Sequence, residues 1–118
     1  MSVDLDQLAH QVALEIETYV APDPSSRLGS PLPPEWYEAG LAEMRQALVS
    51  PYLLEANDHE DGAGGASRSV IVVADDAQET LLAFDPHPDG DFVLVWRHPD
   101  EMVISYIRRD AVGCFLSR

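Results

Sequence analysis

The sequence contains no lysine, only one cysteine and no long hydrophobic run. Because Cys114 has no second cysteine to pair with, an internal disulfide is excluded. Charge, proline or glycine interrupts every hydrophobic run within about seven positions, whereas a membrane-spanning helix needs about 20 apolar residues. Residues 1–10 lack the positive start and the apolar stretch of a signal peptide. We therefore expect a cytoplasmic protein that does not enter the membrane.

Basic residues of any kind are also scarce. The chain has 21 acidic and 7 basic residues, all seven of them arginine, and its formal net charge is −14. Residues 1–61 contain 12 of the acids and 2 of the arginines, so the negative charge is concentrated in the front half. Such a field repels nucleic-acid phosphates and anionic lipids but speeds the encounter with a basic protein. We expect no nucleic-acid binding and no membrane binding, and either a basic protein partner or an acidic surface that serves only solubility.

The length and the hydrophobic content fit one domain with one core. The chain has 118 residues, of which 46% are hydrophobic, and single domains commonly have about 100–200 residues. The pattern predicts a single α+β domain over residues 1–118, in which two N-terminal helices pack on a five-stranded, mostly antiparallel meander sheet and a short C-terminal helix follows. The predicted segments are a helix over 1–21, a proline-rich loop over 22–34, a helix over 35–50, the sheet over 52–107 and a short helix over 110–117.

Both N-terminal helices have recognisable start signals. In residues 4–20 apolar side chains recur at steps of three and four, and Asp4 followed by Gln7 has the form of a capping box. The second helix starts at the proline pair 33–34, because a proline in the first turn of a helix loses no needed N–H. Gly40 in the middle of this helix indicates a close approach by another element.

After the second helix the pattern changes to short β-type runs separated by turn residues. The expected strands are 52–56, 69–74, 80–84, 92–97 and 102–107. Their connections are mostly short, which favours antiparallel neighbours, because a parallel crossover needs about a dozen residues or more. Two unbroken apolar runs, 70–73 and 92–96, indicate central strands or a sheet that is covered on both faces. An open meander has two edges, so a homodimer through an edge strand is a further expectation.

Two loops rich in histidine and aspartate raise the possibility of a metal site. The loops follow alternate strands, so they lie at the same end of a simple meander. Histidine and carboxylate side chains bind divalent metals and act as general acids and bases. If the loops converge, the site consists of His59, Asp61, His87 and Asp89. The alternative function is therefore a small metal-dependent hydrolase or metal-binding domain, although turns use the same residue types without any site.

The leading hypothesis is an acidic, non-enzymatic interaction domain that binds a basic protein partner. Immunity proteins, antitoxins and secretion chaperones share this size and charge, and the analogy extends no further. The acidic front half would steer the encounter, and apolar side chains would supply affinity after docking. The candidate interaction residues are Glu35, Trp36, Tyr37, Glu38 and Glu43. We predict no cofactor and no catalytic residue: Cys114 is expected to pack in the core, and Asp75 and Asp76 are expected to form a turn.

Overall fold

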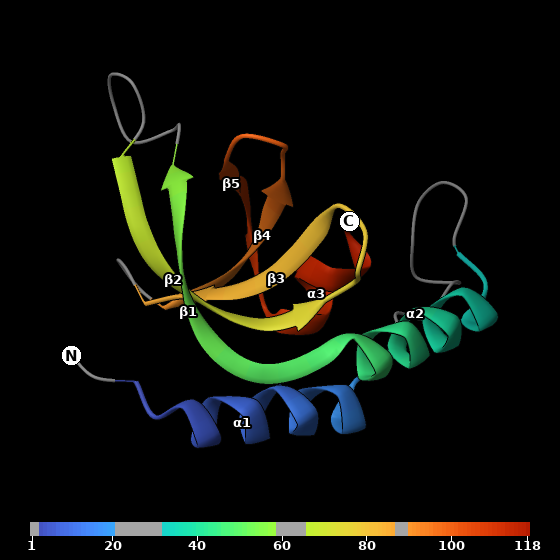
Figure 1. Ribbon diagram of the computed structural model, residues 1–118. Coiled ribbons are helices and arrows are strands. Elements are labelled where there is room, and N and C mark those ends of the chain that lie inside the picture. Colours follow the sequence, from blue (N-terminus) through green and yellow to red (C-terminus); the bar gives the residue numbers. More distant parts are fainter. Residues whose placement is uncertain (1–2, 21–31, 59–65, 87–89) are drawn as a thin grey trace.

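The computed structural model describes residues 3–20, 32–58, 66–86 and 90–118, and these contain three helices and five strands (Figure 1). The predicted α+β class is confirmed. The elements are α1 Leu5–Thr18, α2 Pro34–Ala47, β1 Leu48–Asp58, β2 Ala66–Asp75, β3 Thr80–Asp85, β4 Asp91–Arg97, β5 Met102–Arg109 and α3 Ala111–Leu116.

The helices begin where the sequence predicts. One carboxylate oxygen of Asp4 accepts hydrogen bonds from the N–H groups of Asp6 and Gln7, and Asp110 accepts one from Gly113 at the start of α3. Side-chain caps of this kind satisfy N–H groups that have no partner within the helix. Both N-terminal helices end earlier than expected, α1 at Thr18 and α2 at Ala47.

The first strand begins earlier than predicted. Instead of a helix that runs to residue 50, the chain becomes extended at Leu48, which pairs with Ala74 of β2. The residue before a proline avoids the helical conformation, and a β-branched residue favours a strand, so Val49 and Ser50 before Pro51 suit this early change. The β1–β2 register shifts between Leu48 and Tyr52, which marks an irregularity that bends the strand.

The sheet is a closed barrel, and the predicted open meander is wrong. Consecutive strands are antiparallel as expected, but β1 also pairs in parallel with β5, at Asn57 and Val103. The amide of Asn57 donates a 2.7 Å hydrogen bond to Glu101 beside this seam. Figure 1 shows β1 as a long, curved strand between α1 and the rest of the barrel. The closure removes the two open edges on which the expected homodimer depended, so the homodimer stays a prediction without that support.

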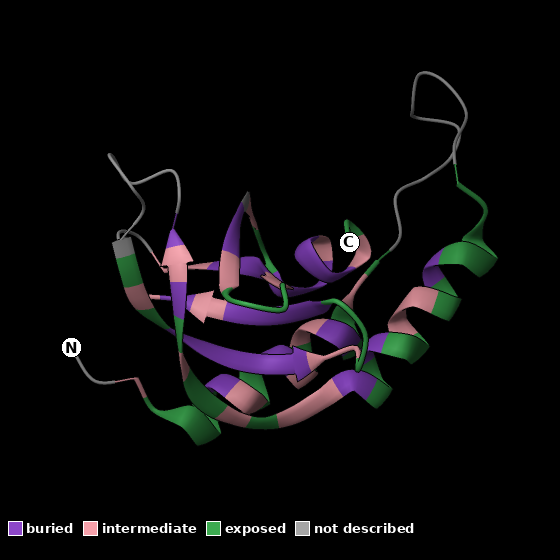
Figure 2. Ribbon diagram, turned by 45° about the horizontal axis from the view of Figure 1, so that its top comes forward, coloured by how far each residue is buried: buried purple, intermediate pink, exposed green. Residues whose placement is uncertain are grey.

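The barrel separates two apolar cores, which explains the unbroken apolar runs in β2 and β4. Successive side chains of a strand point to opposite faces, so Val70 and Val72 enter the barrel while Ile71 and Val73 face the helices. The helix-facing core contains Leu8, Val12 and Ile16 of α1, Met44 and Ala47 of α2, and Val112, Cys114 and Phe115 of α3. Figure 2 shows β3 and much of β2 and β4 as buried, β1 as mostly intermediate or exposed, and the outer surface of the helices as exposed. The expected helical cover on one face of the sheet is therefore present.

Candidate functional site

The predicted interaction residues divide into exposed and buried members of α2. Trp36 is 39% exposed, and Glu35 and Glu38 in the same helical turn are exposed as well. Tyr37 is only 6% exposed, so the expectation that it serves as a surface anchor is wrong. It lies on the core-facing side of α2, and its ring packs edge-on against Trp36 with 5.0 Å between the centroids. Tyr37 therefore packs against Trp36 from the core-facing side of α2.

A groove lies beside Trp36, between α2, α3 and the β2–β3 turn. It consists of three adjoining hollows of about 250, 480 and 610 Å³, and Arg118 lines all three. We call these hollows together the Arg118 groove. Its walls include Trp36, Glu43, Asp76, Glu79, Trp96 and Phe115. The groove therefore combines carboxylates with aromatic rings, and it extends from one tryptophan to the other.

Arg118 occupies the middle of the groove. Its guanidinium carbon lies 4.1 Å from the centre of the Phe115 ring, which is the geometry of a cation–π contact. One guanidinium nitrogen pairs with Glu43, and the other lies 3.9 Å from Asp76. The guanidinium thus has an aromatic ring and two carboxylates as neighbours. Glu43, a predicted interaction residue, therefore lies close to Asp76, for which the sequence predicts only a role in a turn.

The β2–β3 turn explains how Asp76 is held at the groove. One carboxylate oxygen of Asp76 accepts hydrogen bonds from the N–H groups of Gln78 and Thr80, at 2.8 and 3.2 Å. Asp75 accepts from Ala77 in the same way, at 2.8 Å, so the predicted turn role of both aspartates is confirmed. The second oxygen of Asp76 is the one nearest Arg118. A residue that fixes the turn therefore also presents negative charge to the groove.

Asp75 also lines the groove, and its carboxylate forms an ion pair with Arg97. Its carboxylate lies 2.9 Å from a guanidinium nitrogen of Arg97. Burial alone would raise the pKa of Asp75, but the hydrogen bonds from Ala77 and Arg97 and the charge of Arg97 together lower that pKa. Asp75 therefore stays ionised at neutral pH.

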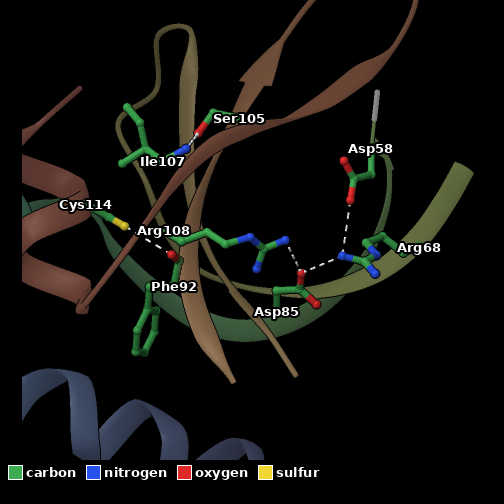
Figure 3. Close-up of polar contacts among 8 residues, drawn as sticks. All are labelled: Asp58, Arg68, Asp85, Phe92, Ser105, Ile107, Arg108 and Cys114. Carbon is green, nitrogen blue, oxygen red and sulfur yellow. Dashed lines mark hydrogen bonds and ion pairs between the residues drawn. The ribbon is translucent and has the colours of Figure 1, made fainter. Parts of the chain in front are cut away.

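A second group of charged residues lies at the end of the barrel where β1, β3 and β5 finish. Asp85 is 1% exposed, and it accepts 2.9 Å hydrogen bonds from both Arg68 and Arg108. Arg68 also lies 3.2 Å from Asp58 (Figure 3). We call these four residues the barrel-end ion network. Two cations face two carboxylates, so the network is balanced, as buried charges must be.

This network is not among the residues predicted from the sequence, although the alternation of side chains along the strands contains a signal for it. Arg68 is in phase with Val70 and Val72, and Asp85 is in phase with Leu81 and Ala83, all of which enter the barrel. Opposite charges at inward positions of neighbouring strands predict a buried ion pair. The role of the network is to close the apolar interior of the barrel at this end.

The predicted metal-site residues His59, Asp61, His87 and Asp89 lie outside the described residues. The strand ends next to them do meet, because Arg68 contacts both Asp58 and Asp85. Within residues 3–20, 32–58, 66–86 and 90–118, no group of three or more His, Cys, Asp or Glu side chains is placed to hold a metal ion. Arginines take up the carboxylates of Asp58 and Asp85, which makes those two poor metal ligands.

A buried thiol and a half-buried carboxylate near α3 have structural roles. The Cys114 thiol donates to the carbonyl oxygen of Phe92 at 3.1 Å, and burial raises its pKa to about 11, so it is no nucleophile at neutral pH (Figure 3). The carboxylate of Glu15 in α1 accepts hydrogen bonds from the N–H groups of Ala111 and Val112, at 3.3 and 2.6 Å. Glu15 therefore joins α1 to the start of α3.

In the part of the chain that the structure describes, no helix is both long enough and apolar enough to cross a bilayer. No protein-family model matches the sequence, and comparisons with curated proteins and with solved structures find no match either.

Proposed function

We propose that this chain is a non-enzymatic interaction domain that binds a basic segment of a partner protein through α2 and the Arg118 groove. The observation that carries the proposal is the position of Trp36, an exposed aromatic side chain at one end of a groove lined by carboxylates, in the same helical turn as two further exposed glutamates. Tryptophan is a frequent anchor in protein interfaces, and a surrounding field of one sign speeds the encounter with a partner of the other sign. This arrangement suits a cationic peptide segment.

The distribution of ion pairs supports an outward negative field. Arginines occupy the carboxylates of Asp58, Asp75 and Asp85, all at the sheet. Among the described residues, the side chains of Glu35 and Glu38 form no ion pair. The excess charge at the start of α2 is thus free to act on an approaching partner, within the reach that salt screening allows.

Titration calorimetry with a short arginine-rich peptide tests the proposal, with an acidic peptide of equal length as a negative control. We expect the arginine-rich peptide to bind and the acidic peptide not to bind. The double variant Glu35→Gln, Glu38→Gln should weaken binding, because it removes charge beside Trp36. The matched double variant Asp6→Asn, Asp91→Asn removes the same charge elsewhere and should weaken binding less. Equal loss in the two double variants, or no binding of the basic peptide, would contradict the proposed site.

The metal-dependent alternative keeps one supporting observation. Asp58 and Asp85 lie next to the segments that contain His59 and His87, and Arg68 joins these two strand ends. A thermal melt with added Zn²⁺, Mn²⁺ or Ca²⁺ tests this alternative, because a metal that binds the folded state raises the melting temperature. A rise that disappears in His59→Ala and His87→Ala would favour the metal site over the interaction domain.

A further inference from the structure

We propose that Glu43, Asp76 and Phe115 form a binding site for an arginine side chain, which Arg118 occupies in the free protein and which an arginine of the partner takes over. The inference rests on the proposed function and narrows it, because it names the side chain that the groove recognises. It also gives Arg118 a role as an internal competitor.

The three side chains match the chemistry of a guanidinium group. A planar cation stacks on the face of an aromatic ring, and its N–H groups pair with carboxylates at its edge. Phe115 supplies the ring at 4.1 Å, while Glu43 and Asp76 supply carboxylates to two different nitrogens of the same guanidinium. A lysine ammonium is a compact point charge that cannot stack in this way. The site should therefore prefer arginine to lysine.

The contacts that hold Arg118 are weak enough to be exchanged. The side chain of Glu43 is 62% exposed, whereas those of Arg118 and Asp76 are 23% and 9% exposed. The pair with Glu43 faces water, and surface pairs of this kind contribute about 1 kcal/mol or less, because water and salt screen them. The contact with Asp76, at 3.9 Å, is longer than a hydrogen bond. Arg118 follows the end of α3 at Leu116, so its side chain can leave the groove without disturbing a helix.

The groove also has room for a longer segment beside the arginine. The hollow lined by Asp76, Gln78 and Phe115 has a volume of about 480 Å³, and the next one, toward Glu79 and Trp96, has about 610 Å³. Both hollows adjoin Arg118 and have carboxylates in their walls. A basic segment anchored by one arginine can thus extend along the groove past additional negative charge.

If Arg118 competes for the site, its removal should strengthen binding. We expect Arg118→Gln to bind a short arginine-rich peptide about fivefold more tightly than the wild type in titration calorimetry, which is the factor that an exposed ion pair supplies. The gain should be smaller for a lysine-rich peptide of equal length. Glu43→Gln, which removes one carboxylate charge from the site, should weaken arginine binding in both the wild type and the Arg118→Gln background.

The matched control is Arg45→Gln, which changes the net charge equally. Arg45 pairs with Glu17 at 3.8 Å and does not line the groove. Equal gains in Arg118→Gln and Arg45→Gln would show a charge effect alone and overturn the arginine site, while the proposed function would stand. Weaker binding by Arg118→Gln, or equal gains for the arginine and lysine peptides, would also overturn it. Absence of binding in the wild type and in both variants would overturn the site and the proposed function together.

Discussion

The side chain of Asp85 is tightly constrained by its surroundings in the barrel. It is almost fully buried, and two arginines donate to the same carboxylate oxygen. Arg108 also has a buried guanidinium nitrogen with no hydrogen-bond partner among the residues that the structure describes. The network thus tolerates little further loss of partners. Asp85 is the member that contacts both arginines.

Replacing Asp85 with alanine should therefore destabilise the protein severely. The substitution leaves Arg108 with an uncompensated charge in a mostly buried position, and breaking a buried pair costs about 3–5 kcal/mol. The midpoint of urea unfolding measures this loss. Asp100→Ala, at an exposed aspartate, should change the free energy of unfolding by about 0.5 kcal/mol or less. Similar unfolding midpoints for the two variants would contradict the structural role of the network.

The carboxyl group of Glu15 should make the stability of the fold depend on pH. Desolvation by burial and the nearby charge of Asp110 raise the pKa of Glu15 above 4.5, while the hydrogen bonds from Val112 and Ala111 lower it, and burial dominates. A raised pKa means that the folded state favours the neutral carboxyl. Glu15 therefore contributes most stability below pH 4.5, and this contribution is lost as the pH rises through its folded-state pKa.

The variant Glu15→Gln should consequently be at least as stable as the wild type at pH 7, because a neutral amide oxygen still accepts from Ala111 and Val112. That advantage should shrink as the pH falls through the folded-state pKa toward 4.5, and it should change little below 4.5. Glu15→Ala, which removes the acceptor, should be less stable than the wild type throughout. Melting temperatures across this pH range distinguish the cases. If Glu15→Gln lost as much stability at pH 7 as Glu15→Ala, the predicted cost of burying the ionised Glu15 carboxylate would be contradicted.

At the level of elements, Gly40 explains how α2 and α3 come close enough to form the groove. A Cβ atom at position 40 would lie 2.4 Å from a terminal carbon of Leu116, so only glycine fits without a shift of that side chain. The predicted close approach at Gly40 is therefore confirmed. Gly40→Leu should push α3 away and destabilise the fold by about 1–3 kcal/mol, the usual cost of overpacking.

The control for Gly40→Leu is Ala42→Leu, at an exposed position of the same helix. Chemical unfolding should show a loss for the first variant and almost none for the second. Peptide binding should weaken only in Gly40→Leu, because α3 supplies Phe115 and leads to Arg118. A Gly40→Leu protein with unchanged stability and binding would show that the close contact has no importance for the groove.

The sequence predicts these elements better than it predicts their assembly. Local signals fix the helix starts at Asp4 and Asp110 and place the strands, because capping and strand periodicity act over a few residues. These local signals do not predict that the barrel closes, because closure depends on sheet twist and on register shifts such as the one between Leu48 and Tyr52. The same limit applies to the groove, where Glu43 and Asp76 meet only because distant elements pack together.

At the scale of the whole molecule, the net charge is −14, and the ion pairs that compensate acidic side chains are unevenly distributed. At the sheet, arginines occupy Asp58, Asp75 and Asp85, whereas the start of α2 displays its glutamates without an ion pair among the described residues. The molecule therefore balances charge where it is buried and leaves it free at the surface beside Trp36. An outward field of this kind acts on the rate of association more than on the strength of the final contacts.

The salt dependence of the association rate tests this account most directly. Stopped-flow mixing with the arginine-rich peptide, followed by tryptophan fluorescence, should show an association rate constant that falls steeply as ionic strength rises, because salt screens the steering field. The variant Glu35→Gln, Glu38→Gln should show a shallower dependence than Asp6→Asn, Asp91→Asn. An association rate that does not change with salt, or that changes equally in both variants, would contradict the claim that α2 directs a basic partner to the groove.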